Sequence, residues 1–212
     1  MAFSFFCIVP KNSKKYLKNV KNSINFVILA IFCCMELFRG YAFSNVTCSR
    51  LSEFLGEYLV DKKPVFLCLG TDKVVGDCMA PLVADFLRQQ ELPYYIYGGL
   101  SAPITAQNCE FAFEFTRSVH TDSDIILIDS MATREQARLG DIVVSEEYYG
   151  AINSLKIKPD LCIYGVTSIL KNGLLNSARL YNVEKTAKII AKSIKNAINL
   201  HKFAKNIDIL CS

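Results

Sequence analysis

Apolar positions along the middle of the chain follow two different spacings. Continuous apolar runs of strand length occupy residues 65–69, 94–97, 125–128 and 161–166. Elsewhere apolar residues recur every three or four positions, as on one face of a helix, over residues 51–59, 82–87, 105–118 and 175–204. Unbroken apolar strands are typical of a parallel sheet that is covered on both faces. The alternation predicts a three-layer α/β/α fold, with a mostly parallel sheet and helices on both faces.

Two elements in the second half of the chain complete the predicted layout. The stretch from Asp129 to Ile142 is too short for a helical crossover, so residues 142–145 are expected to form an antiparallel or edge strand. The closing helix over 175–204 carries apolar residues on one face and lysines on the other. Its basic face is expected to be solvated rather than functional.

The segment before residue 47 breaks this pattern. A cluster of lysines near the start is followed by an apolar run over residues 24–38, which Glu36 interrupts. The run is shorter than the roughly 20 residues of a membrane helix, although its order of charged, apolar and small residues resembles a signal. We expect residues 1–46 to be an extension outside the core. Two interpretations stay open: a signal-like or membrane-associated segment through residues 24–38, or a cytoplasmic extension without membrane contact. Residues 47–212 are expected to form a single α/β domain.

Composition narrows the classes of function. The chain has 212 residues and a formal charge of +4, and its lysines gather near the start and in the last helix. No basic stripe interleaved with aromatic residues is visible between residues 50 and 180, which argues against nucleic-acid binding. The nine cysteines include no C-x-x-C pair and no cluster with histidine at zinc spacing. They predict a reducing, cytoplasmic compartment and no metal.

Acidic residues follow two of the predicted strands. In doubly wound sheets ligands bind beyond the carboxyl ends of the strands, and in the common 2-1-3 order the site lies between the first and third strands. The loop after the first strand contains Asp72 and Asp77, and Asp129 follows the third strand. These acids are therefore expected at one crevice. Gly70 and Gly76 would let the loop turn tightly and bring backbone N–H groups toward a substrate.

Paired carboxylates in a partly dry crevice suit hydrolysis of an amide. Two such groups do not both ionise easily, so one holds a proton and acts as an acid while the other activates water. The alternative is structural: Asp72 and Asp77 cap the loop and the next helix, and Asp129 caps a turn. Spacing alone leaves the two interpretations equally open.

Other chemistries find less support in the sequence. There is no G-x-S-x-G motif, and His120 precedes the third strand, at the opposite edge of the sheet from the acids. The glycine loop ends in neither a P-loop Gly-Lys-Ser/Thr nor a dinucleotide fingerprint. No cofactor is therefore expected.

Four short motifs occur in order along the chain. They are Cys-Leu-Gly-Thr-Asp with Gly-Asp and Pro-Leu-Val within 68–83, Tyr-Gly-Gly-Leu and a proline within 97–103, Ile-Asp-Ser at 128–130, and Asn-Ser-Ala-Arg-Leu at 176–180. These motifs resemble the YyaC-type spore proteins, a family related to the germination protease of endospore formers. The resemblance covers about residues 50–200, and the glycine-aspartate loop is its most specific part.

The resemblance implies an α/β/α fold shared with the hydrogenase maturation proteases and an aspartate-type peptidase activity on small acid-soluble spore proteins. The acids of the germination protease fall on Asp77 and Asp129, and Asp72 is a secondary catalytic candidate. The maturation enzymes place metal ligands at the same two positions but also need a histidine, which has no counterpart here, so no metal is expected. The motif residues expected to contact the substrate are Gly70, Thr71, Gly76 and Ser130.

Three hypotheses follow. The leading one is an aspartate-dependent endopeptidase of sporulation or germination, in the cytoplasm of the forespore or mother cell, with a protein or peptide substrate. The second is a non-catalytic sporulation protein that binds a peptide or partner in the same crevice. The third is a membrane-tethered domain whose location depends on residues 24–38.

Overall fold

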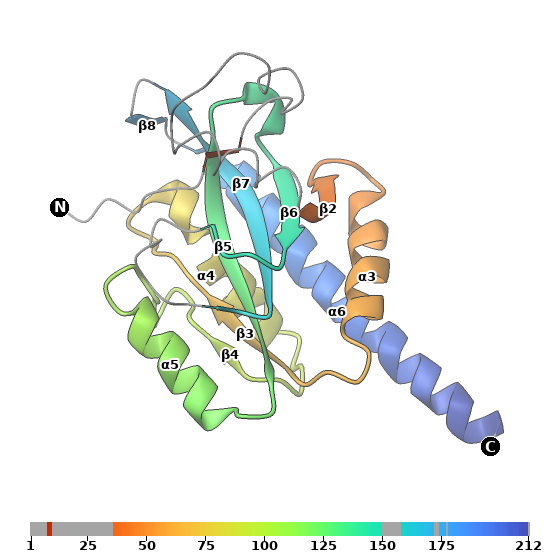
Figure 1. Ribbon diagram of the computed structural model, residues 1–212. Coiled ribbons are helices and arrows are strands. Elements are labelled where there is room, and N and C mark those ends of the chain that lie inside the picture. The colour runs from red at the N-terminus through yellow and green to blue at the C-terminus, as the bar shows by residue number, and fades with distance from the viewer. Residues whose placement is uncertain (1–7, 10–35, 150–157, 172–173, 177, 212) are drawn as a thin grey trace, which may run out of the picture.

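The computed structural model describes residues 8–9, 36–149, 158–171, 174–176 and 178–211, which form an eight-stranded sheet with helices packed against it (Figure 1). The strands are β1 (Ile8–Val9), β2 (Glu36–Tyr41), β3 (Pro64–Cys68), β4 (Ile96–Tyr97), β5 (Asp124–Thr133), β6 (Asp141–Ser145), β7 (Leu161–Lys171) and β8 (Leu174–Asn176). The helices are α3 (Thr47–Tyr58), α4 (Met79–Arg88), α5 (Cys109–Val119) and α6 (Leu180–Cys211), with short 3-10 helices η1 (Val75–Cys78) and η2 (Gln136–Arg138).

The sheet has the order β2-β6-β7-β5-β3-β4, with β1 beside β5 and β8 beside β7. Strands β7, β5, β3 and β4 run parallel, and β6 is antiparallel to both β2 and β7. The first three predicted strands, β3, β4 and β5, stand in the predicted 2-1-3 order. Cys68 at the end of β3 pairs with Ile128 of β5. The predicted α/β class with a mostly parallel sheet is confirmed.

Helices cover both faces of the sheet. Alternate strand residues face opposite sides, so each central strand supplies two cores. On one face α3, α4 and α6 pack over Phe66, Ile126 and Ile163. On the other face α5 packs over Leu67 and Leu127. Figure 1 shows α5 on one side of the sheet and α6 on the other.

Two central strands extend beyond their apolar runs. β5 continues through Asp129 to Thr133, and β7 continues to Lys171. Asp129 pairs with Tyr164, and a register shift follows between Met131 and Ala132. The prediction that Asp129 follows the strand is therefore wrong. The residue lies inside β5, because backbone pairing with β7 continues past the point where the apolar run stops.

The predicted boundary at residue 46 is also wrong. β2 belongs to the sheet and pairs with β6, with Gly40 opposite Ile142. Phe38 and Ala42 are buried in the core. The strand at 142–145 is antiparallel as predicted, but β2 covers it, so it is not an edge. Residues 24–35, the rest of the predicted apolar segment, lie outside the described residues.

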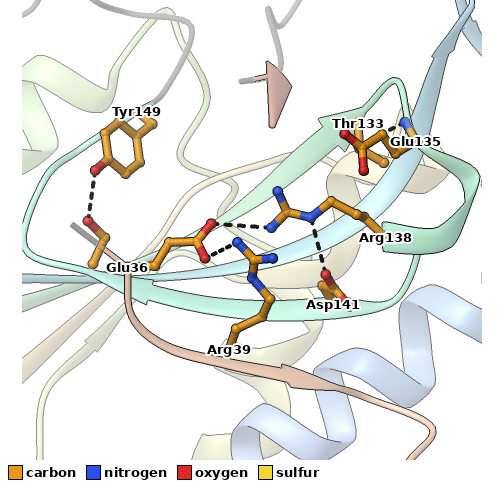
Figure 2. A network of polar contacts seen from close by, with 8 residues as sticks. Glu36, Arg39, Thr133, Glu135, Arg138, Asp141 and Tyr149 are labelled. Atoms are coloured by element: carbon orange, nitrogen blue, oxygen red, sulfur yellow. Dashed lines mark hydrogen bonds and ion pairs between the residues drawn. The ribbon is translucent and has the colours of Figure 1, made fainter. Parts of the chain in front are cut away.

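A buried ion network attaches β2 to the strand beside it (Figure 2). Arg138 of η2 is 6% exposed and lies 3.2 Å from Oε1 of Glu36 and 3.3 Å from Oδ2 of Asp141. Arg39 forms a second ion pair with Glu36. Burial raises the pKa of Asp141, and the neighbouring Arg138 opposes this rise. Charges as well as backbone hydrogen bonds therefore hold β2 in place.

The closing helix begins later than predicted. Residues 174–176 form β8, which pairs with the end of β7, and α6 starts at Leu180. The predicted apolar stripe is buried, including Val183, Ile190 and Ile194. No helix within the described ranges has the length and apolar character to cross a membrane.

Candidate active site

Asp129 lies on β5 between β3 and β7, near the centre of the sheet. Its side chain is partly exposed. Oδ1 accepts a hydrogen bond from the backbone N–H of Ser130 at 2.7 Å. Oδ2 lies 3.4 Å from the hydroxyl of Tyr148, which donates to it. The carboxyl group thus has one fixed partner on each oxygen.

The glycine loop after β3 determines the position of Asp77. Gly70 has a φ of 142°, and a Cβ atom there would lie 2.0 Å from the carbonyl oxygen of Asp77. Only glycine permits this close approach of η1 to the end of β3. The hydroxyl of Thr167 donates to the carbonyl oxygen of Gly76 at 2.8 Å, which attaches the same turn to β7. Asp77 is consequently buried, with 5% of its surface exposed.

The two predicted acids share one electrostatic environment. Burial is the largest influence on Asp129 and raises its pKa well above the usual range, and the negative charge of Asp77 raises it further. The Ser130 N–H and the Tyr148 hydroxyl act in the opposite direction but more weakly. Asp129 therefore retains its proton at a pH where an ordinary aspartate is ionised.

The wall around Asp129 consists of weakly acidic groups. Burial raises the pKa of Cys109 on α5 to about 11 and that of Cys162 on β7 to about 12. Burial also raises the pKa of Tyr164, which pairs with Asp129 across the strands. These groups stay neutral at physiological pH, so they strengthen electrostatic interactions at the acids without adding charge.

The remaining predicted residues differ in their positions. Asp72 is exposed, and the hydroxyl of Thr71 lies 3.5 Å from its Oδ1. Thr71 also accepts the backbone N–H of Lys73, so these residues close the turn. Ser130 is 6% exposed, and its hydroxyl has no hydrogen-bond partner within the described part of the chain. Because strand side chains alternate, Ser130 points away from the face of Asp129, and only its backbone N–H reaches that carboxyl.

Tyr148 is a site residue that the sequence patterns did not indicate. It lies shortly after β6, in no recognisable motif, and its contact with Asp129 joins residues of different elements. The order of strands is the only signal that leads to it. β6 lies directly beside β7 and runs antiparallel to it. The residues that follow β6 therefore begin next to one end of β7, and no crossover helix lies between them in the part of the chain that the structure describes.

His120 lies away from the two acids. Nε2 of His120 lies 2.8 Å from the hydroxyl of Tyr97, just before β5 begins, at the opposite end of the sheet. No group of three histidine, cysteine or acidic side chains suited to a metal ion occurs among the residues that the structure describes. What the geometry offers is acid-base chemistry: the buried Asp77 within electrostatic reach of Asp129, a carboxyl group whose pKa is raised.

Comparisons with known proteins agree with the motifs. Residues 41–193 match the model of a family described as "Protein of unknown function (DUF1256)". An uncharacterized protein YyaC of Bacillus subtilis strain 168 is 28% identical over 141 residues, which are 63% of this chain and 68% of that protein. A NiFe hydrogenase maturation protease HycI from Thermococcus kodakarensis KOD1 is similar in structure, with a TM-score of 0.43 and 14% identity, over 66% of this chain and 98% of that chain. The resemblance to YyaC-type proteins is thus confirmed.

Proposed function

The chain belongs to the DUF1256 family, and from that premise we propose that it is an aspartate-dependent endopeptidase in which Asp77 and Asp129 hydrolyse a peptide bond. One observation carries the proposal. Asp129 is a carboxyl group whose pKa is raised by burial and by the charge of Asp77, so it holds its proton to a higher pH than an ordinary aspartate does. Environments of this kind assign separate acid and base roles to two chemically identical groups.

The proposed reaction needs only these two side chains and water. The carboxylate of Asp77 takes a proton from a water molecule, whose oxygen forms a bond with the carbonyl carbon of the substrate. Asp129 then gives its proton to the amide nitrogen as the carbon–nitrogen bond breaks. Transfer of a proton from Asp77 back to Asp129 restores the starting state, and no cofactor takes part.

Substrate and location are part of the proposal. The resemblance of the glycine-aspartate loop to the YyaC-type spore proteins supports small acid-soluble spore proteins as substrates. It equally supports action in the cytoplasm of a forespore or mother cell. Gly70 and Gly76 keep the turn close to the strand ends, and the backbone of this turn and Thr71 are the proposed contacts for an extended substrate.

The test is cleavage of a purified small acid-soluble spore protein by the full chain. Asp77→Asn and Asp129→Asn should each lower kcat by about 10²–10⁴ while circular dichroism shows an intact fold. Asp122→Asn is the matched control, because Asp122 is an exposed acid just before β5 and should leave the rate unchanged. An Asp129→Asn variant that cleaves as fast as the parent would refute the proposal. Peptide binding without turnover, surviving in Asp77→Asn, would instead identify a binding protein.

A further inference from the structure

The hydroxyl of Tyr148 lies against the carboxyl group of Asp129, where no sequence motif places it. It is 3.4 Å from Oδ2 of Asp129, longer than the roughly 2.5–3.0 Å of a typical O–H···O hydrogen bond. Contacts between catalytic groups are often long without substrate and shorten in the reacting complex. The opposite carboxyl oxygen already accepts the backbone N–H of Ser130. Tyr148 is therefore the side chain that faces the oxygen left available.

A second tyrosine holds the turn that carries Tyr148. The hydroxyl of Tyr164 accepts the backbone N–H of Tyr149 at 2.7 Å and donates to the carbonyl oxygen of Glu147 at 3.2 Å. The rings of Tyr149 and Tyr164 pack with centroids 6.0 Å apart. The hydroxyl of Ser145 at the end of β6 bonds that of Tyr149 at 3.2 Å. The residues on both sides of Tyr148 are thus attached to the sheet.

Tyr164 also defines where this turn lies relative to Asp129. The two residues are directly paired across β7 and β5. The phenol that anchors the turn therefore stands beside the carboxyl group that the turn covers. Tyr164 is 1% exposed, and a buried hydroxyl with both a donor and an acceptor partner is rigid. Tyr148 is consequently placed by the strand that neighbours the site.

We propose that Tyr148 is a positioning residue of the acidic pair, which orients the Asp129 carboxyl by donating a hydrogen bond to Oδ2 and thereby sets how firmly that group holds the shared proton. The inference rests on the proposed peptidase function for its kinetic part. Its geometric part stands without turnover, because the proton on Asp129 can be measured in the resting protein.

The direction of the effect follows from the groups that face Asp129. Within the described residues these are Asp77 of η1, Cys109 of α5, Cys162 and Tyr164 of β7, and Tyr148 itself. Asp77 raises the pKa of Asp129, and the cysteines and phenols are neutral. A hydroxyl that donates to the ionised carboxyl stabilises that form. Loss of the hydroxyl should therefore raise the pKa of Asp129 further.

The experiment is a carbon-13 NMR titration of the Asp129 carboxyl in the full chain and in Tyr148→Phe, assigned with Asp129→Asn. The midpoint should rise by about half a pH unit or more in Tyr148→Phe. If cleavage is observed, the alkaline limb of the pH profile of kcat/KM should move to higher pH by the same amount, which is about a threefold change in rate on that limb. Because orientation rather than binding is lost, kcat should fall about tenfold and KM less than about twofold.

Two further variants complete the test. Tyr95→Phe is the control, since Tyr95 is 63% exposed and precedes β4, at the end of the sheet away from Asp129. The titration midpoint of Asp129 in this variant should equal that in the parent. Tyr164→Phe releases the turn and should move the midpoint in the same direction as Tyr148→Phe; it replaces that variant if the latter does not fold. A midpoint that stays or falls in the folded variant overturns the proposal. Absence of cleavage with a raised midpoint overturns only the peptidase function.

Discussion

Replacing Asp129 by asparagine should stabilise the protein at neutral pH while it removes the proposed activity. The carboxyl is partly buried and lies within electrostatic reach of the negative charge of Asp77, and both influences raise its pKa. An acid with a raised pKa in the folded state supports folding fully below its unfolded pKa, about 3.9, and this support is lost as the pH rises through the folded pKa. Asparagine has no such loss.

The magnitude follows from the contacts that asparagine keeps. Its amide oxygen still accepts the Ser130 N–H, seen at 2.7 Å, and its amide N–H₂ can donate to the Tyr148 oxygen. Hydrogen bonding is therefore conserved, and the net change is removal of the ionisation penalty. Each pKa unit of elevation corresponds to about 1.4 kcal/mol. Since Asp129 is partly exposed and screened by solvent, we expect a gain of about 1–3 kcal/mol at pH 7.

Urea unfolding followed by circular dichroism measures this gain. At pH 7 the urea midpoint of Asp129→Asn should exceed that of the parent. In thermal unfolding its Tm should be higher by roughly 2–4 °C for each kcal/mol gained. The difference should shrink as the pH falls through about 4 and approach zero near pH 3, where the parent is protonated in both states. Asp122→Asn should show no such pattern. An Asp129→Asn variant that is less stable than the parent at pH 7 would refute the reasoning.

Two further predictions concern the scaffold, and thermal unfolding measures both. Arg138→Met leaves the buried carboxylate of Asp141 without its ion pair and removes one of the two arginine partners of Glu36, so it should lower the free energy of unfolding by about 3–5 kcal/mol. Arg39→Met, whose side chain is 44% exposed, should lower it by less than about 1 kcal/mol, and equal effects would contradict the role of the buried network. Gly70→Ala combines a positive φ with a Cβ 2.0 Å from the Asp77 carbonyl oxygen, so it should lower the free energy of unfolding by more than about 2 kcal/mol and weaken cleavage. Gly56→Ala in α3, where the nearest atom would lie 3.9 Å from the new Cβ, should be neutral or stabilising. A harmless Gly70→Ala would show that the close approach is not required.

Comparison of sequence and structure shows what long-range pairing added to the site. Sequence motifs indicated Asp77 and Asp129, and strand order explains why two acids so far apart along the chain lie within electrostatic reach of each other. Tyr148 escaped notice because its contact depends on the turn that Tyr164 anchors. Ser130 was expected to contact the substrate, but strand alternation directs its side chain to the other face of β5.

The sequence by itself determined the local elements of this protein. Apolar runs such as 125–128 exclude water on both faces, and helical stripes such as 51–59 bury one side, so type and order of these elements follow from solvation alone. The tertiary structure decided where β5 ends and whether β2 exists, because a strand is completed by backbone hydrogen bonds to a distant partner. It also decided the character of the acidic pair. The pKa of a carboxyl group depends on burial and on charges that only folding brings near.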